Sequence, residues 1–231
     1  MSKAPIVFLF DIDNTLLDHD RVTVDLRRHL DSVVGPAKSA RYWEIFEQLR
    51  SDLGYADYLG ALQRYRVENL GDSQLLAVSF YLLNYPFANR LYPGSLDAVA
   101  HARRFGPTVI LSDGDVVFQP RKIYKSGLYE VFEGQVLIYI HKELQLRDVE
   151  DAYPASHYVI VDDKLRVLDA MKRFWGQRVT TVFVRQGHYA MDEKATANYQ
   201  PSDISLDRIG DFISLGQASF TKSMTAAPGL G

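Results

Sequence analysis

Two aspartates spaced two residues apart follow the first apolar run of the chain. The run is IVFLF at residues 6–10, and Asp11 and Asp13 come directly after it. Carboxylates at the end of a buried strand destabilise a fold unless something compensates their charge, because burial removes them from water. The pair therefore indicates a site at which the carboxylates bind a cation or take part in a chemical reaction.

Acidic and hydroxyl side chains also end two later apolar runs. They are Ser112 and Asp113 after residues 108–111, and Asp162 and Asp163 after residues 158–161. One aspartate in such a place, for example Asp113 or Asp115 taken alone, is more often a capping or turn residue. Ligands of open α/β sheets bind beyond the carboxyl ends of the strands. The groups taken together therefore predict one shared site.

Oxygen ligands without cysteine or histidine favour a hard cation such as Mg²⁺. Lys142, which lies between a histidine and a glutamate, is a candidate for a fixed positive charge at the same place. The expected site thus combines several carboxylates, a divalent cation and a lysine.

Short apolar runs and helical patterns alternate along most of the chain. Buried strands are expected at residues 6–10, 108–111, 158–161 and 179–184, with a weaker edge strand or hairpin at 136–140. Their continuous hydrophobicity is typical of strands covered on both faces, as in a parallel sheet. With helices expected at residues 95–105 and 164–175, the pattern predicts a doubly wound parallel-sheet α/β domain.

Residues 20–90 interrupt this alternation with three or four helical stripes separated by turn signals. We expect an all-α helical cap at 20–90, inserted in a core domain made of residues 1–19 and 91–220. Asp18 is expected to be a turn or cap-entry residue. Residues 221–231, which end in SMTAAPGLG, are expected to form a flexible tail.

Composition excludes several classes of protein. The 231 residues include no cysteine, so disulfides and thiolate metal sites are ruled out. A net charge of -3 argues against a general nucleic-acid binder, which would present a basic face. The sequence has no apolar run of membrane-spanning length and no secretion signal at its start. A cytoplasmic protein without nucleic-acid or membrane partners is therefore expected; the composition says nothing of its oligomeric state.

The motifs resemble those of the haloacid dehalogenase-like (HAD) hydrolase superfamily. FDIDNTL at 10–16 is similar to the first motif, ILSDGD at 110–115 to the second, Lys142 to the third and VIVDDKLRVLDAMK at 159–172 to the fourth. The resemblance covers about residues 6–187 and implies a Rossmann-like core with an inserted helical cap. Glu143 stands where the family commonly has proline, so Lys122 and Lys125 stay open as alternatives for the motif lysine.

The resemblance also implies a mechanism. Asp11 would be the nucleophile that forms an aspartyl-phosphate, and Asp13 would protonate the leaving oxygen and later deprotonate water. The metal ligands that it implies are Asp11, Asp13 through its backbone carbonyl, Asp163 and, directly or through water, Asp162. Phosphate would be bound by Ser112, Asp113 and Lys142.

The acid at position 13 separates the chemistries of the superfamily. Halide-releasing members typically lack it, because a halide leaves without a proton, whereas phosphatases and phosphomutases keep it. We therefore expect a Mg²⁺-dependent phosphatase acting on a small phosphorylated metabolite, a sugar phosphate or a nucleotide monophosphate. A phosphomutase and a binding or regulatory protein without turnover stay open as alternatives.

The helical cap is expected to exclude water and to contact the substrate. Its hinges are expected in the DHDR stretch after Leu17 and in the segment near 89–94. Its candidate substrate contacts are polar residues near these hinges and on the helices: His19, Arg21, Arg41, Arg64, Arg66 and Arg90.

Overall fold

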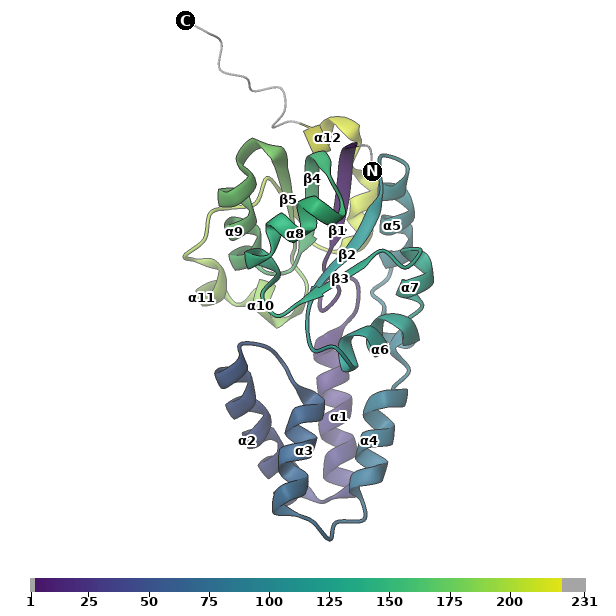
Figure 1. Cartoon of the computed structure of the whole chain (residues 1–231), viewed down its shortest axis with the longest axis vertical. Helices are drawn as coiled ribbons and strands as arrows, with labels where there is room; N and C mark the ends of the chain where they lie inside the picture. The colour runs from purple at the N-terminus through teal and green to yellow at the C-terminus, as the bar shows by residue number, and fades with distance from the viewer. Residues whose placement is uncertain (1–2, 222–231) are drawn as a thin grey trace, which may run out of the picture.

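A six-stranded, wholly parallel sheet forms the centre of the protein (Figure 1). The structure, a computed structural model, describes residues 3–221. The strand order is β3-β2-β1-β4-β5-β6, so the first strand of the chain lies between β2 and β4. The strands are β1 (Ala4–Phe10), β2 (Thr108–Asp113), β3 (Val136–Tyr139), β4 (Ala155–Asp162), β5 (Val179–Val184) and β6 (Ile204–Leu206).

The four main strands predicted from the sequence are confirmed, and two edge strands add detail. The weak run at 136–140 is β3, which pairs in parallel with β2 and is therefore an edge strand rather than a hairpin arm. Strand β6 on the opposite edge was not predicted, because its three residues are too short to give an apolar run.

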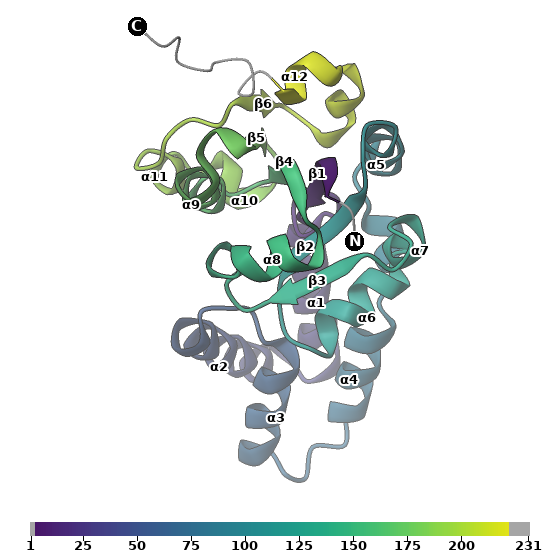
Figure 2. The same cartoon turned by 45° about the horizontal axis from the view of Figure 1, so that its top comes forward.

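Helices cover both faces of the sheet, which explains the continuous apolar runs (Figure 2). Phe8 and Phe10 point to the face covered by α5 (Ser95–Arg103), the 3-10 helix η4 (Ile209–Ser214) and α12 (Gln217–Thr221). Val7 and Leu9 point to the face covered by α8 (Leu146–Ala152) and α9 (Leu165–Trp175). The doubly wound α/β class expected from the sequence is thereby confirmed.

Four α-helices and a short 3-10 helix lie between β1 and α5, in the long interval that separates β1 from β2. They are α1 (His19–Val33), α2 (Pro36–Leu53), α3 (Tyr58–Glu68), α4 (Leu75–Asn84) and η1 (Phe87–Arg90). In Figure 1 they lie beyond the end of the sheet to which the strands run. Helices are therefore placed over the carboxyl ends of the strands.

Local signals set the ends of these helices. The Asp18 carboxylate caps α1 by accepting the Arg21 backbone N–H at 2.9 Å, in agreement with its expected entry role. Pro36 begins α2, and Gly54 ends it in the left-handed region at φ 79°. The apolar side of the helices joins the cluster on one face of the sheet through Tyr58 and Phe118.

The division into a core of 1–19 with 91–220 and a cap of 20–90 stays a prediction. The expected tail at 221–231 lies outside the described residues except for Thr221, which ends α12. After β2 the chain also forms α6 (Phe118–Lys125), α7 (Leu128–Val131) and the 3-10 helices η2 (Lys142–Leu144) and η3 (Gly176–Arg178). Two short helices, α10 (Gly187–Met191) and α11 (Glu193–Thr196), follow β5. No helix of residues 3–221 has the length and hydrophobicity that crossing a membrane requires.

Candidate active site

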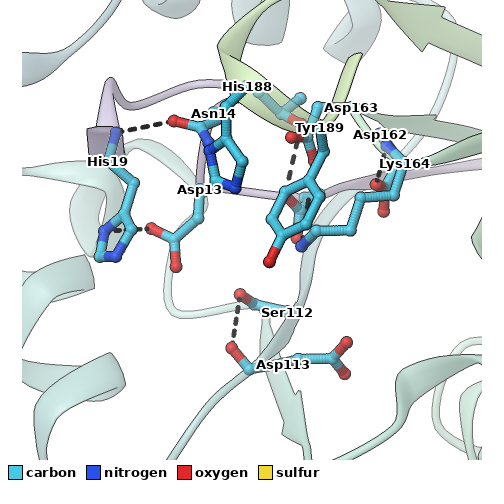
Figure 3. A network of polar contacts seen from close by, with 12 residues as sticks. Asp13, Asn14, His19, Ser112, Asp113, Asp162, Asp163, Lys164, His188 and Tyr189 are labelled. Carbon is cyan, nitrogen blue, oxygen red and sulfur yellow. Dashed lines mark hydrogen bonds and ion pairs between the residues drawn. The ribbon is translucent and has the colours of Figure 1, made fainter. Parts of the chain in front are cut away.

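The residues predicted from the strand ends converge on one edge of the sheet (Figure 3). Asp11 follows β1, Ser112 and Asp113 end β2, and Asp162 and Asp163 stand at the end of β4. Because β1 lies between β2 and β4 and all three run in parallel, their carboxyl ends are adjacent. Topology thus brings together residues that are up to 152 positions apart in the sequence.

Three buried carboxylates form the acidic cluster of the site. Asp11, Asp162 and Asp163 each offer an oxygen within 4.8 Å of the others. Both Asp163 oxygens are buried without a hydrogen-bond partner, and Lys164 Nζ, 4.0 Å from Oδ1, is a distant cation. Burial raises the pKa of Asp163 well above its usual value. Buried oxygens without partners are rare in folded proteins, and a hard cation satisfies them, so this donor set fits Mg²⁺.

Lys142 carries the positive charge beside the cluster. Its Nζ lies 2.5 Å from Asp11 Oδ1 and 2.7 Å from Asp162 Oδ2, and its side chain is fully buried. Burial by itself would lower the pKa of Lys142, but attraction to Asp11 and Asp162 raises it above its usual value. The lysine is therefore charged and held against the predicted nucleophile.

The predicted nucleophile has an altered acidity. Burial, opposed by Lys142 and reinforced by Asp162, raises the pKa of Asp11 to about 6. Thr15 Oγ1 donates a hydrogen bond of 3.3 Å to the other carboxylate oxygen. In the absence of a cation, Asp11 is thus ionised only from about pH 6 upward.

Asp13 belongs to a second cluster and not to the acidic one. Both of its oxygens lie 2.7 Å from Lys122 Nζ, and His19 Nδ1 is 3.4 Å from Oδ1. Burial would raise the pKa of Asp13, but Lys122 and His19 outweigh it and hold the pKa below the usual range. Lys122 engages the side chain of Asp13, so the metal contact through the Asp13 backbone carbonyl stays a prediction.

His19 is neutral near pH 7 and joins this second cluster to the inserted helices. Burial and the nearby Lys122 charge lower its pKa to about 4. Its Nε2 lies 2.8 Å from the hydroxyl of Tyr58, the first residue of α3. The insertion therefore reaches the side chain of Asp13 through His19.

The structure distinguishes the three candidate lysines. Lys142 contacts Asp11, while Lys122, in α6 (Phe118–Lys125), contacts Asp13 and is 1% exposed. Lys125 is exposed at the end of the same helix. Lys142 therefore lies beside the predicted nucleophile, as expected of the motif lysine. Lys122 lies beside Asp13 instead, and the sequence did not reveal that contact.

The two predicted phosphate ligands of β2 have different environments. Ser112 Oγ is buried and accepts a hydrogen bond of 2.8 Å from Gln119 Nε2. The Asp113 carboxylate accepts the Lys142 backbone N–H at 2.7 Å, so it positions the lysine segment. An anion would be repelled by this carboxylate, and the geometry does not support phosphate binding by the Asp113 side chain. Asp115 accepts the backbone N–H groups of Val117 and Phe118 in the turn that leads into α6.

A cavity of about 470 Å³ opens between the inserted helices and the cluster of Asp13, His19 and Lys122. Of the candidate substrate contacts, only His19 lines it. Arg41 pairs with Glu68 and Arg90 with Asp25 elsewhere on the insertion. Sequence reasoning missed several lining residues because the orientation of the helices decides which side chains face the cavity: Arg27, Arg50, Gln119, Lys122, Lys164 and Tyr189.

Comparison with known proteins supports the same fold. A family model for haloacid dehalogenase-like hydrolases matches residues 7–184. A crystal structure of a haloacid dehalogenase-like hydrolase from Burkholderia xenovorans LB400 is similar, with 62% identity and a TM-score of 0.88, covering 92% of this chain and 99% of that one. The comparison with curated proteins gave no match.

Two more distant structures share the fold alone. L-2-haloacid dehalogenase from Xanthobacter autotrophicus has 16% identity and a TM-score of 0.60, covering 90% of this chain and 97% of that one. The magnesium-bound HAD-hydrolase YfnB from Bacillus subtilis has 15% identity and a TM-score of 0.59, covering 92% and 98%. With the family model spanning most of its length, the chain belongs to the haloacid dehalogenase-like hydrolase family.

Proposed function

We propose that the protein is a Mg²⁺-dependent phosphatase that hydrolyses a small phosphomonoester through an aspartyl-phosphate on Asp11. The observation that carries this proposal is the buried Asp163 carboxylate, whose two oxygens have no partner and lie beside Asp11. A carboxylate nucleophile attacking a phosphate dianion needs compensating positive charge. A halide-releasing reaction has no such requirement.

The residues that would hold Mg²⁺ are Asp11, Asp162 and Asp163, together with the backbone carbonyl of Asp13. When bound, the ion would supply positive charge against the phosphoryl oxygens. Lys142 contributes a further fixed charge at 2.5 Å from Asp11, and Ser112 offers a hydroxyl at the end of β2. The sugar phosphate and nucleotide monophosphate classes both suit such a site.

In the first step an oxygen of Asp11 attacks phosphorus, and the bond between phosphorus and the leaving oxygen breaks. The leaving oxygen keeps the bonding electron pair and takes a proton from the Asp13–Lys122 pair. In the second step Asp13 accepts a proton from a water whose oxygen attacks the phosphorus of the aspartyl-phosphate. The bond between phosphorus and the Asp11 oxygen breaks, so inorganic phosphate is released and the Asp11 carboxylate is restored. The proton taken from water returns the Asp13–Lys122 pair to its starting state.

Lys122 is assigned a part in the proton transfer because of its contacts with Asp13. Its Nζ lies 2.7 Å from both oxygens of Asp13, and Gln119 Oε1 accepts another of its hydrogen bonds at 2.8 Å. A carboxylate held as an anion by an ammonium group is unprotonated, as a general base has to be. To donate one it needs a neighbouring source, and the ammonium group of Lys122 is such a source.

The test is a phosphate-release assay of the full chain with Mg²⁺ over a panel of sugar phosphates and nucleoside monophosphates. We expect release from at least one compound and none from the Asp11→Asn variant. Release by that variant, or no release from any compound, would overturn the proposal. Chloride release from 2-chloropropionate without a metal would assign the protein to the dehalogenases, and an isomeric phosphate as product would assign it to the phosphomutases.

A further inference from the structure

The outer cavity, the part of the cavity that lies beyond Asp13 and Lys122, has no part in the steps above. Its walls come from α1, α2, the start of α3, α6 and the segment after β5. A volume of about 470 Å³ falls within the range of pockets that enclose a whole small molecule. A leaving group that takes a proton from the Asp13–Lys122 pair would therefore extend into the outer cavity.

One wall of the outer cavity is aromatic. Trp43, Phe46, Tyr58 and Phe118 line it and are each at most 5% exposed. Successive ring centroids lie 5.3 Å apart for Trp43–Phe46, 4.6 Å for Phe46–Tyr58 and 5.3 Å for Tyr58–Phe118. Because they come from three different helices and contact one another, the rings form a continuous, rigid apolar surface. Such a surface binds a flat or apolar group.

One face of α1 runs from the reacting centre to the positively charged side chain of Arg27. His19, Thr23 and Arg27 all line the cavity and are spaced four residues apart, so they share one face of the helix. His19 contacts Asp13, and Arg27 follows about 12 Å further along the axis at 1.5 Å per residue. The Arg27 guanidinium lies over the Trp43 ring, 4.4 Å from its centroid. It therefore stands at the far end of the aromatic wall.

The acidic side chains of the cavity are engaged by other groups. Asp13 pairs with Lys122, Asp20 with His188, and Glu47 with Arg50. The Asp113 carboxylate accepts the Lys142 backbone N–H. Among residues 3–221, Arg27 forms no ion pair, and its guanidinium stacks on the Trp43 ring. An arginine stacked on a buried indole is pre-oriented and leaves its in-plane donors free for an anion.

We propose that the leaving group of the substrate carries a planar ring that packs on this aromatic wall and a second anionic group that pairs with Arg27. A carboxylate or a second phosphate meets the requirement, because both accept paired hydrogen bonds from a guanidinium. The proposal rests on the proposed function for the phosphate end of the substrate. It adds the chemistry of the other end.

The kinetic test compares 4-carboxyphenyl phosphate with phenyl phosphate, which differ only in the distal anion. We expect the carboxylate to raise kcat/KM by about tenfold or more, mainly through KM, as a charge-assisted hydrogen bond does. Arg27→Gln should abolish this advantage and Arg27→Lys should restore part of it. Arg28→Gln, one residue along the same helix and 66% exposed in its side chain, is the matched control and should leave the advantage intact.

A binding test separates this inference from the proposed function, because it needs no turnover. The chain has two tryptophans, and Trp175 stacks on Tyr158 in the apolar cluster on the other face of the sheet. In a Trp175→Phe, Asp11→Asn protein, 4-carboxyphenyl phosphate should therefore quench Trp43 fluorescence, and Arg27→Gln should weaken the binding about tenfold.

The two tests together distinguish a failure of this inference from a failure of the proposed function. One outcome is binding that depends on Arg27 while the protein with Asp11 intact hydrolyses no phosphomonoester. This outcome would support the second anion site and overturn the proposal that the protein is a phosphatase. Hydrolysis with equal kcat/KM for the two phenyl phosphates, or an advantage that survives Arg27→Gln, would overturn the inference and leave the phosphatase standing.

Discussion

The ionised Asp11 carboxylate destabilises the folded protein, and Asp11→Asn should remove this effect. Asp11 is 2% exposed, and burial, partly offset by Lys142, raises its pKa from 3.8 to about 6. The folded state therefore holds the proton more tightly than the unfolded state does. Below about pH 4 both states are protonated and Asp11 adds no penalty; as the pH rises through 6, both become ionised and the stabilisation by the bound proton is lost.

The size of the effect follows from the pKa difference. A rise from 3.8 to about 6 corresponds to roughly 3 kcal/mol at about 1.4 kcal/mol for each pKa unit. Asparagine is nearly isosteric and neutral at every pH, and Lys142 keeps Asp162 at 2.7 Å. The stability of Asp11→Asn relative to the original protein should therefore increase by up to about 3 kcal/mol between pH 4 and pH 7.5.

Urea denaturation at both pH values, in EDTA so that no divalent cation neutralises the cluster, measures this difference. Asp151→Asn, which removes an exposed carboxylate at the end of α8, is the control and should show a difference that barely changes with pH. If Asp11→Asn gains no stability relative to the original protein as the pH rises, the account of Asp11 as a penalised buried anion is wrong.

Four further predictions concern the other charged groups. Asp163→Asn should remove Mg²⁺ binding measured by isothermal titration calorimetry, since it deletes a buried carboxylate whose oxygens have no hydrogen-bond partner; unchanged affinity would contradict the assignment of the cation site. Excess EDTA should stop phosphate release and added Mg²⁺ should restore it; full turnover in EDTA would show that the reaction does not depend on a metal. Lys122→Met should lower kcat by about 10²–10⁴-fold, the usual range for a proton-transfer group, with little change in KM, while Lys125→Met on the same helix should leave both unchanged. Lys142→Met should lower the free energy of unfolding by about 3–5 kcal/mol in thermal denaturation, because it leaves two buried carboxylates without their cation, and a loss below about 1 kcal/mol would refute that coupling.

Local sequence patterns were sufficient for the strands and for the acidic cluster. The apolar runs before Asp11, Ser112 and Asp162 each form a strand that ends at the expected residue or within two of it. A buried parallel strand needs a continuous apolar run, and the acids follow such runs directly, so composition and order already imply their shared edge. The same reasoning missed β6, since three residues at a sheet edge leave no run to detect.

The lysines illustrate what lay beyond the sequence. Lys142 is 131 residues from Asp11, and it reaches the site because β3 lies beside β2 and Asp113 holds its backbone N–H. Lys122 was considered only as a substitute for the motif lysine, yet the packing of α6 directs it to Asp13. A lone lysine in a sequence carries no information about which of several carboxylates it will meet.

The sequence by itself determined the fold class, the order of the strands along the chain and the candidate residues Asp11, Asp13 and Asp163. These depend on hydrophobic runs and spacings within short segments, where the physical preferences of the chain are local. Only the tertiary structure decided that Asp13 pairs with Lys122 and that Arg27 stands over Trp43 at the end of an aromatic wall. Those placements depend on how helices far apart in sequence pack against one another, and packing is settled by the shapes and charges of all the contacting side chains together.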